Sequence, residues 1–234
     1  MAGNFKAQTR EKNIFNDYRY PHPKTKGPVN GGKYPGQMTW FVTASGEIGL
    51  KCDDGVYDPN NKNANKVKEV KLTATDRGQL FSAIRRAVDN KMFEKCQVQI
   101  RRHDFVFEGG RSKRTEKPIV ICEFTVLRDK ETGLISLGYR KGDYRVKYDF
   151  TSSNNNIVKV FKDGQWEDDI GATSQLYTLG YLNWIEPSLN ALENARHTPP
   201  KSKENNSNSN SDQNYGNNSN SSSNDYDFDE DIDF

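Results

Sequence analysis

The chain has 234 residues, a net charge of +2 and 33% hydrophobic residues. Met1–Arg10 contains no apolar core of the kind that a secretion signal carries, and no segment approaches the length of a membrane span. The three cysteines, Cys52, Cys96 and Cys122, are an odd number without CxxC spacing. They predict reduced, mostly buried thiols and a cytoplasmic protein, and they argue against a disulfide framework.

The small net charge hides a segregation of charge along the chain. Residues 225–234 contain six acids and no base, so the remaining chain holds 34 bases against 26 acids (32 − 6), a charge of +8. A basic body with an acidic tail favours a polyanionic partner. The competing interpretation is a solvated surface with a solubilising tail.

The first 36 residues mix bases, aromatic residues and prolines without a regular period, which predicts an extended arm or a wrapped loop. Met38–Thr43 and Ile48–Cys52 are rich in β-branched and aromatic residues and flank a Ser-Gly-Glu turn, so they predict a β-hairpin. The alternation of Val67–Thr73 predicts a further strand.

One amphipathic helix is expected in the middle of the chain. Thr75 is its expected N-cap, with Asp76 at the positive end of the helix dipole. An apolar stripe at helical spacing is expected to face the core, while Arg77, Arg85 and Arg86 lie off it. The stripe consists of Leu80, Phe81, Ile84, Ala87 and Val88.

Strand patterns resume after this helix. They cover Gln97–Arg101, Phe105–Phe107, Ile119–Leu127, Leu134–Tyr139, Tyr144–Phe150 and Ile157–Phe161. A last helix is expected from about Ser174, and Pro187 is expected to break or restart it because proline lacks the amide that a helix interior needs.

About seven to nine short strands with two helices, and no βαβ repeat, predict a β-rich α+β fold. The first interpretation is an antiparallel OB-like barrel with an inserted helix and a C-terminal helix. The alternative is a curved sheet plus helix of the PC4 or Whirly type, and periodicity does not choose between them.

Four regions follow from composition. Residues 1–36 form a basic and aromatic arm, and residues 37–198 form the nucleic-acid-binding domain. Residues 199–224 form a disordered linker, because Lys201–Asn224 contains nine Asn and eight Ser and cannot bury enough apolar surface to fold. Residues 225–234 form an acidic tip.

The motifs of nucleotide-binding loops, zinc proteases and serine hydrolases are missing from the sequence. The three histidines and three cysteines are too scattered for ordinary zinc spacing. The acidic run Glu167–Asp169 is expected to be a charged surface loop. We therefore expect no catalytic residue, no metal and no cofactor.

Bases and aromatic residues alternate within the later strands. Cations neutralise phosphates and release counterions, while aromatic rings stack on unpaired bases for about 1–3 kcal/mol each. In residues 144–148 the tyrosines share one face with Val146, and Arg145 and Lys147 share the other, so one face suits a core and the other a binding groove. The candidate DNA-binding residues are Arg101, Arg102, Phe105, Arg111, Lys113, Arg114, Tyr139, Arg140, Lys141, Tyr144, Arg145 and Lys147. For the rings among them, burial in the core is the competing interpretation.

The chain ends in Asp-Phe-Asp-Glu-Asp-Ile-Asp-Phe behind the polar linker. This tip resembles the C-terminus of bacterial single-stranded DNA-binding proteins, in which acids precede Ile-Pro-Phe; here Asp233 stands in place of that proline. The basic body does not resemble the domain of that family, so the resemblance implies a phage-type member in a bacterial or phage-infected cell. The implied partner-binding residues are Asp229, Glu230, Asp231, Ile232, Asp233 and Phe234.

The tip has a physical role without the resemblance. A terminal Phe with its own carboxylate can enter an apolar pocket rimmed by bases, while the acids before it steer the encounter or compete for the protein's own groove. A solubilising tail would explain the acids but not Ile232 and Phe234.

These patterns predict a sequence-tolerant single-stranded DNA-binding protein that coats strands in replication, recombination or repair and recruits proteins through its tip. An RNA-binding or chaperone-like module is the second hypothesis, and a DNA-processing enzyme or its accessory subunit is the third. Membrane association is not expected, and self-association is left open.

Overall fold

The computed structural model of the chain describes residues 14–15, 17, 19–43, 46–57, 64–108, 111–151 and 156–197, without the side chains of residues 64, 65, 106–108, 111 and 112. The predicted linker and acidic tip lie outside the described residues. The chain divides into two units after Thr198, and all described residues belong to the first.

The first sheet confirms the predicted hairpin. Its strands pair antiparallel in the order β1-β2-β3, with Trp40 opposite Leu50. Gly46 has a φ of +84°, a left-handed conformation that favours glycine in the β1–β2 turn. The predicted third strand is shorter than expected, because a five-residue helix takes its first part. The elements are β1 (Gln37–Val42), β2 (Ile48–Asp53), α1 (Ala64–Lys68) and β3 (Glu69–Lys71).

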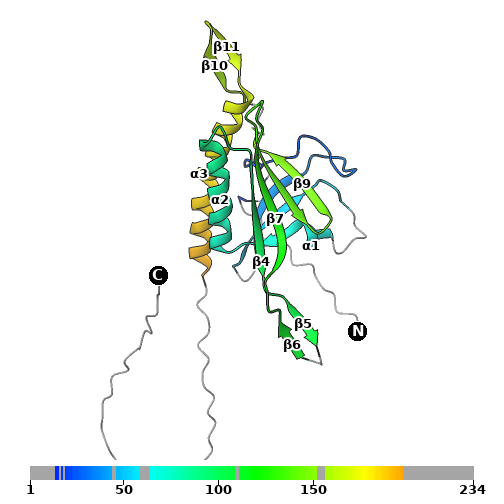
Figure 1. Cartoon of the computed structure of the whole chain (residues 1–234). Coiled ribbons are helices and arrows are strands. Elements are labelled where there is room, and N and C mark those ends of the chain that lie inside the picture. Colours follow the sequence, from blue (N-terminus) through cyan, green and yellow to red (C-terminus); the bar gives the residue numbers. More distant parts are fainter. Residues whose placement is uncertain are drawn as a thin grey trace, which may run out of the picture. The chain divides into compact units, whose positions relative to one another are not determined.

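The second sheet has the antiparallel order β4-β7-β8-β9 and confirms four of the later predicted strands. Two hairpins extend from the fold (Figure 1): one lies between β4 and β7, and the other follows β9. Arg111–Arg114, which contains three of the predicted DNA-binding residues, forms the second strand of the first hairpin. The elements are β4 (Lys95–Arg102), β5 (Phe105–Glu108), β6 (Arg111–Arg114), β7 (Ile119–Arg128), β8 (Ile135–Lys141), β9 (Tyr144–Asp149), β10 (Lys159–Lys162) and β11 (Gln165–Asp168).

The main chain of Lys24 joins the two sheets. It forms antiparallel bridges to Gln37 at the start of β1 and to Asp149 at the end of β9. The Asp149 amide donates to the Lys24 carbonyl at 2.8 Å, and the Met38 amide donates to the Pro23 carbonyl at 3.0 Å. The strands therefore continue as β3-β2-β1-Lys24-β9-β8-β7-β4. Pro23 and Lys24, in the predicted N-terminal arm, are thus hydrogen-bonded to the strands of both sheets.

Helix α2 (Ala74–Asp89) buries the apolar stripe that the sequence predicts. Its N-cap is Thr73 rather than Thr75, because the Thr73 hydroxyl accepts the Asp76 amide while the Asp76 carboxylate accepts the Thr73 amide, a capping box. The prediction that Arg77 lies away from the buried side of the helix is wrong. Its side chain is buried, donates to the Leu72 carbonyl at 3.0 Å and pairs with Glu193.

Helix α3 runs without interruption from Ile170 to Arg196, so the predicted break at Pro187 is wrong. Leu182, Ile185 and Leu189 are fully buried on either side of the proline. Their burial stabilises one continuous helix and outweighs the loss of a single main-chain hydrogen bond. Figure 1 shows α2 and α3 together against one side of β4 and β7, and Arg85 pairs with Glu186 across the two helices.

The core fills the space between the sheets and these helices. The Trp40 indole packs at 5.6 Å from the ring of Phe81 and donates to the Tyr181 hydroxyl at 2.9 Å. Cys52 and Cys122 are buried and Cys96 is partly buried, and all three are free thiols. Burial raises the pKa of Cys122 to about 12.

The fold is α+β with antiparallel sheets, as predicted at that level. Between β3 and β4, the two edge strands of the described sheet, no ladder is formed, so the described strands do not close into a barrel. No helix among the described residues is both long and apolar enough to cross a bilayer.

The Asp76 carboxylate generates a prediction. Burial opposes its ionisation, but hydrogen bonds from Arg102 and Thr73 outweigh this effect and lower the pKa of Asp76. A lowered pKa gives stability that is present above the unfolded value of 3.8 and is lost as the pH falls through the folded value. We expect the free energy of unfolding to fall more steeply between about pH 5 and about pH 3 in the wild type than in Asp76→Asn.

Urea unfolding at both pH values measures this difference. At neutral pH, Asp76→Asn should be less stable than the wild type by about 1–2 kcal/mol, the usual cost of weakening a helix cap. Equal acid sensitivity of the two proteins would show that Asp76 does not stabilise the fold through its charge.

Candidate nucleic-acid interface

The sheet face that points away from the helices is polar. Along β7 and β8, side chains alternate between the core and this outer face, as strand geometry requires. Phe124 and Tyr139 are buried, whereas Thr125 and Arg140 lie on the outer face. The same alternation on β9 buries Val146 and Tyr148 and exposes Arg145 and Lys147, which agrees with the predicted core face and leaves the opposite face exposed.

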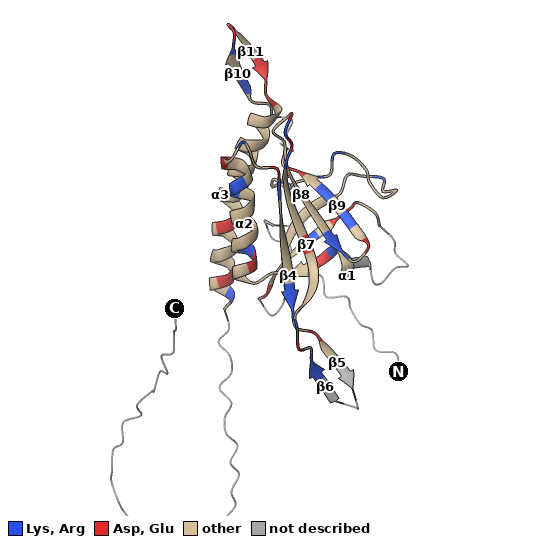
Figure 2. Ribbon diagram, viewed as in Figure 1, with Lys and Arg blue, Asp and Glu red and all other residues tan. Residues whose placement is uncertain are grey.

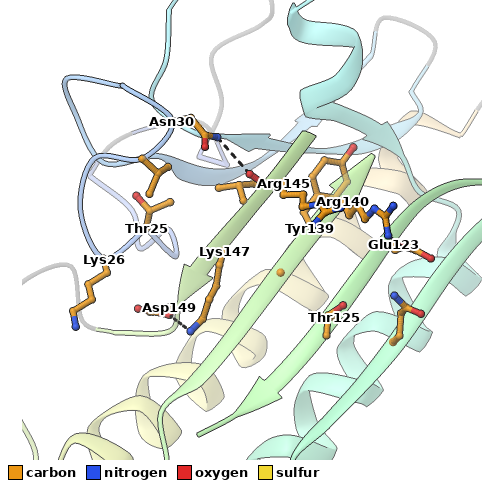
Figure 3. Close-up of a pocket in the computed structure, with 14 residues that line it drawn as sticks. Thr25, Lys26, Asn30, Glu123, Thr125, Tyr139, Arg140, Arg145, Lys147 and Asp149 are labelled. Carbon is orange, nitrogen blue, oxygen red and sulfur yellow. Dashed lines mark hydrogen bonds and ion pairs between the residues drawn. The ribbon is translucent and has the colours of Figure 1, made fainter. Parts of the chain in front are cut away.

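A cleft of about 640 Å³ lies on this outer face. Figure 3 shows strands as its floor and the loop after Lys24 along one side. Four bases and two acids line it, so its formal charge is +2. The lining residues are Thr25, Lys26, Val29, Asn30, Gln97, Glu123, Thr125, Gly138, Tyr139, Arg140, Arg145, Val146, Lys147 and Asp149.

Two arginines face each other across the strands of the cleft. Arg140 on β8 pairs in register with Arg145 on β9, and both side chains are exposed. Like charges directly opposite each other destabilise a sheet. An anion bound between the two guanidinium groups would remove that repulsion, so this pair is suited to binding a phosphate.

The acids of the cleft temper its charge without neutralising it. The Glu123 carboxylate lies 3.6 Å from the Arg140 guanidinium and also accepts the Gln99 amide at 2.8 Å. The Asp149 carboxylate lies 3.8 Å from the Lys147 ammonium and accepts the Ser136 hydroxyl at 2.8 Å. Both ion pairs are long, and the bases in them are more than half exposed, so each pair is weak and its base can turn to a ligand.

The loop wall is anchored through Asn30. Its side-chain amide donates to the Asp54 carboxylate at 3.1 Å and to the Arg145 carbonyl at 3.4 Å. The buried Lys68 ammonium lies 2.6 Å from Asp54. Burial opposes ionisation of Asp54, but the hydrogen bonds from Lys68 and Asn30 outweigh it and lower the pKa of Asp54. The cleft is therefore preorganised by an ionised, buried carboxylate.

The tyrosines among the predicted DNA-binding residues lie on the core side of the sheet. Tyr139 is buried and donates its hydroxyl to the Val67 carbonyl at 2.9 Å. Tyr144 is half-buried and donates to the Cys52 carbonyl at 2.8 Å. Burial raises the pKa of both phenols. In this structure both rings pack in the core and hold the two sheets together.

Two predicted bases have partners elsewhere in the fold. Arg102 pairs with Asp76 at the start of α2. Lys141 donates to the Lys66 carbonyl at 2.5 Å and to the Glu69 carbonyl at 3.0 Å, which ties β8 to the edge of the first sheet. Arg101 is exposed and donates to the Gln99 side chain at 3.0 Å.

Three further predicted residues that the structure describes are not part of the cleft lining. Phe105, Lys113 and Arg114 are exposed on the β5–β6 hairpin. The side chain of Arg111 and the whole tip 229–234 lie outside the described residues. Of the twelve predicted DNA-binding residues, the structure therefore brings Arg140, Arg145 and Lys147 together in the cleft, and Tyr139 also lines it.

Sequence reasoning missed the loop residues Lys26 and Asn30, because nothing local shows that the N-terminal segment folds back over β9. It also missed the exposed rings of Tyr34 and Tyr57, which are 63% and 87% exposed. Both rings belong to loops that meet through glycines: a Cβ on Gly55 would lie 2.2 Å from the Tyr34 carbonyl oxygen, and one on Gly36 2.3 Å from the Asp53 carbonyl oxygen. In the sequence, the only sign of these two rings is that each tyrosine stands close to glycines of a turn.

No family model, curated protein or solved structure matches the chain. Within the described ranges, no group of three His, Cys, Asp or Glu side chains is placed to hold a metal ion. The geometry of the cleft itself is therefore the basis for a functional proposal.

Gly138 forms part of the cleft floor and generates a prediction. A Cβ at this position would lie 3.6 Å from the Thr125 carbonyl oxygen, an ordinary contact, so a side chain would extend into the cleft without displacing the sheet. We expect Gly138→Val to leave the free energy of unfolding unchanged or to raise it by about 0.5–1 kcal/mol, because valine suits a strand better than glycine.

Thermal unfolding measures the stability of Gly138→Val. Binding of sulfate or of oligonucleotides measures whether the valine side chain blocks the cleft. Gly49→Val is the contrasting variant, because a Cβ there would lie 2.2 Å from the Phe41 ring and should destabilise the protein. Strong destabilisation by Gly138→Val would show that the cleft floor has no room for a side chain.

Proposed function

We propose that the protein binds single-stranded DNA along the outer face of the second sheet, with little dependence on sequence. The pair of arginines that face each other across β8 and β9 carries this proposal. Together with Lys26 and Lys147 they line a cleft whose bases exceed its acids. Such a site takes phosphates, and phosphate contacts position a strand without reading its bases.

The size of the cleft favours one strand over a duplex. The cleft volume of about 640 Å³ lies within the range of small-ligand pockets. A cleft of this size accommodates a few linked nucleotides of an extended strand. The wall formed by the loop after Lys24 narrows the face on one side. A strand in the cleft would present its bases outward, in keeping with sequence-tolerant binding.

The exposed rings of Tyr34 and Tyr57 are the proposed stacking residues. They lie on the same two loops as Asn30 and Asp54, which build the cleft wall, and Lys33 lies over the Tyr34 ring at 5.4 Å from its centroid. Flat rings with an adjacent cation are the combination that single-strand binders use. They replace Tyr139 and Tyr144 in the proposed interface.

The order of elements supports the PC4 or Whirly-like alternative over the OB-like barrel. One open sheet precedes α2, a second precedes α3, and the described strands stay open between β3 and β4. A curved-sheet fold leaves a broad open face, which suits the outer-face site. This fold analogy is part of the proposal and carries no information on function by itself.

In this proposal the protein coats strands during replication, recombination or repair in a bacterial or phage-infected cell, and has no catalytic role. The acidic tip 225–234 recruits proteins with basic, apolar-floored pockets, since a terminal Phe with its carboxylate suits such a pocket. The linker before it, 26 residues long (199–224), lets the tip reach partners while the body holds DNA.

The decisive experiment is fluorescence anisotropy with single-stranded DNA, duplex DNA and single-stranded RNA across a salt series. We expect the tightest binding to single-stranded DNA and a steep loss of affinity with salt. Arg145→Ala/Lys147→Ala should lower the slope of log affinity against log salt by about 1.4, because each phosphate contact on a single strand contributes about 0.7.

Arg86→Ala/Lys91→Ala is the matched control, since it removes two exposed bases that do not line the cleft. An equal change of slope in the control would mean that the protein's general charge, and not the cleft, binds DNA. Equal affinity for duplex DNA would overturn the proposal. A preference for RNA would also overturn it and would favour the RNA-binding hypothesis.

The stacking residues have their own prediction. Tyr57→Ala should weaken single-strand binding by about 1–3 kcal/mol at every salt concentration and leave the salt slope unchanged, because stacking releases no counterions. Tyr20→Ala is the contrasting variant, because the Tyr20 ring already stacks on Trp184 at 5.6 Å within the fold. Unchanged affinity of Tyr57→Ala would remove this ring from the interface.

A further inference from the structure

Two short hairpins leave the body of the fold in different directions (Figure 1). Hairpin β5–β6 is inserted between β4 and β7, and hairpin β10–β11 connects β9 to α3. Among the residues that the structure describes, neither hairpin is paired with a strand of the two larger sheets. An isolated two-stranded ribbon is only marginally stable in water. Both hairpins therefore have free edges and faces that could bind a partner.

The hairpins lie at opposite ends of the β4–β7 strand pair. Hairpin β5–β6 continues from Arg102 and returns to Ile119, which face each other at one end of the pair. At the other end, Arg128 pairs with Ile135, whose amide donates to the Ser174 hydroxyl in the second turn of α3 at 2.9 Å. Hairpin β10–β11 precedes that turn. Since β7 has ten residues, about 33 Å of strand separates the two ends.

The two hairpins carry opposite charges. Residues 105–114 contain three bases and one acid, a charge of +2, and residues 159–168 contain two bases and three acids, a charge of −1. Figure 2 shows basic residues on β6 and acidic residues on β11, at opposite ends of the fold. The described charged side chains of these strands, among them Lys113, Arg114 and Glu167, are exposed.

Each hairpin also exposes aromatic surface beside its charges. Phe161 and Trp166 pair across β10 and β11 with their ring centroids 5.3 Å apart, and their exposed fractions are 59% and 66%. On the other hairpin, Phe105 is 65% exposed and lies directly opposite Arg114. Aromatic rings and arginine are enriched in protein interfaces, where they supply most of the binding energy.

We infer that hairpin β10–β11 of one copy docks on hairpin β5–β6 of the next, so that copies associate head to tail. The rings of Phe161 and Trp166 cover Phe105, and Glu167 and Asp168 meet Lys113 and Arg114. Pairing of two identical hairpins is disfavoured, because it would bring like charges together. The two surfaces are different and lie at opposite ends of the fold. The association is therefore heterologous and can continue along a line of copies.

A line of copies gives the proposed coating of DNA its cooperativity, and that consequence rests on the proposed function. The association itself does not. It can be measured on the protein alone, so failure of DNA binding and failure of head-to-tail association are separate results.

The test uses two full-length charge variants. Lys113→Glu/Arg114→Glu changes the charge of the first hairpin from +2 to −2, and Glu167→Lys/Asp168→Asn changes that of the second from −1 to +2. Asparagine is used at position 168 because lysine there would stand directly opposite Lys159. Sedimentation velocity over a concentration series at low salt should show that the wild type associates. Each variant alone should associate at least about tenfold more weakly.

Mixing the two variants is the sharper measurement. In the mixture every contact between unlike copies joins hairpins of opposite charge, so association should return towards that of the wild type. A shared loss of folding cannot produce this recovery. Lys33→Glu/Lys66→Glu is the control for Lys113→Glu/Arg114→Glu, since it makes the same change of −4 in net charge at exposed lysines outside both hairpins and should associate as the wild type does.

Three results would overturn the inference: a wild type that stays monomeric throughout the series, variants that associate as the wild type does, or a mixture that shows no recovery. Binding to oligo(dT) of two lengths then distinguishes a direct role of hairpin β5–β6 in DNA binding from its role between copies. Lys113→Glu/Arg114→Glu should keep the wild-type affinity for the shortest oligo(dT) that binds one copy and lose cooperativity on a long one. Equal losses on both lengths would assign hairpin β5–β6 to DNA and contradict its role between copies.

Discussion

The main chain of Lys24 is the link on which the rest of this fold depends. Through its bridges to Gln37 and Asp149 it turns two separate sheets into one curved surface. The same residue starts the loop that forms one wall of the cleft. Without this link, the core between the sheets and the cleft on the outer face would both lose a side. A backbone hydrogen bond made by an early segment of the chain thus connects folding to the candidate site.

The structure divides the many bases of the chain into two groups. Lys68, Arg77, Arg102 and Lys141 are bound to carboxylates or carbonyls and hold elements of the fold together. Arg140, Arg145 and Lys147 lie on the open face and are only weakly paired. The body charge of +8 is therefore a poor measure of the binding surface. Only bases that remain solvated before binding can exchange water and counterions for phosphates.

The sequence predicted most strands, the apolar stripe of α2 and the alternation on β9, because each of these depends on a local period. It missed what depends on tertiary contacts. Pro187 stays helical because the buried residues around it hold one rod, and Arg77 is buried because Glu193, more than a hundred residues away, pairs with it. The cleft combines a loop near residue 26 with strands near residue 140, and no local pattern connects them. The tip 229–234 and the single-stranded DNA it implies stay predictions.

The contact between Gly36 and Gly55 has a consequence for recognising remote relatives of this chain. At both positions any side chain would collide with the opposing backbone, so neither can change without moving the loops that carry the cleft wall. Surface charges and loop lengths can drift freely by comparison. Two glycines at this spacing, one before β1 and one after β2, should thus persist in diverged homologues after overall similarity has faded, and they offer a sparse signature for finding them.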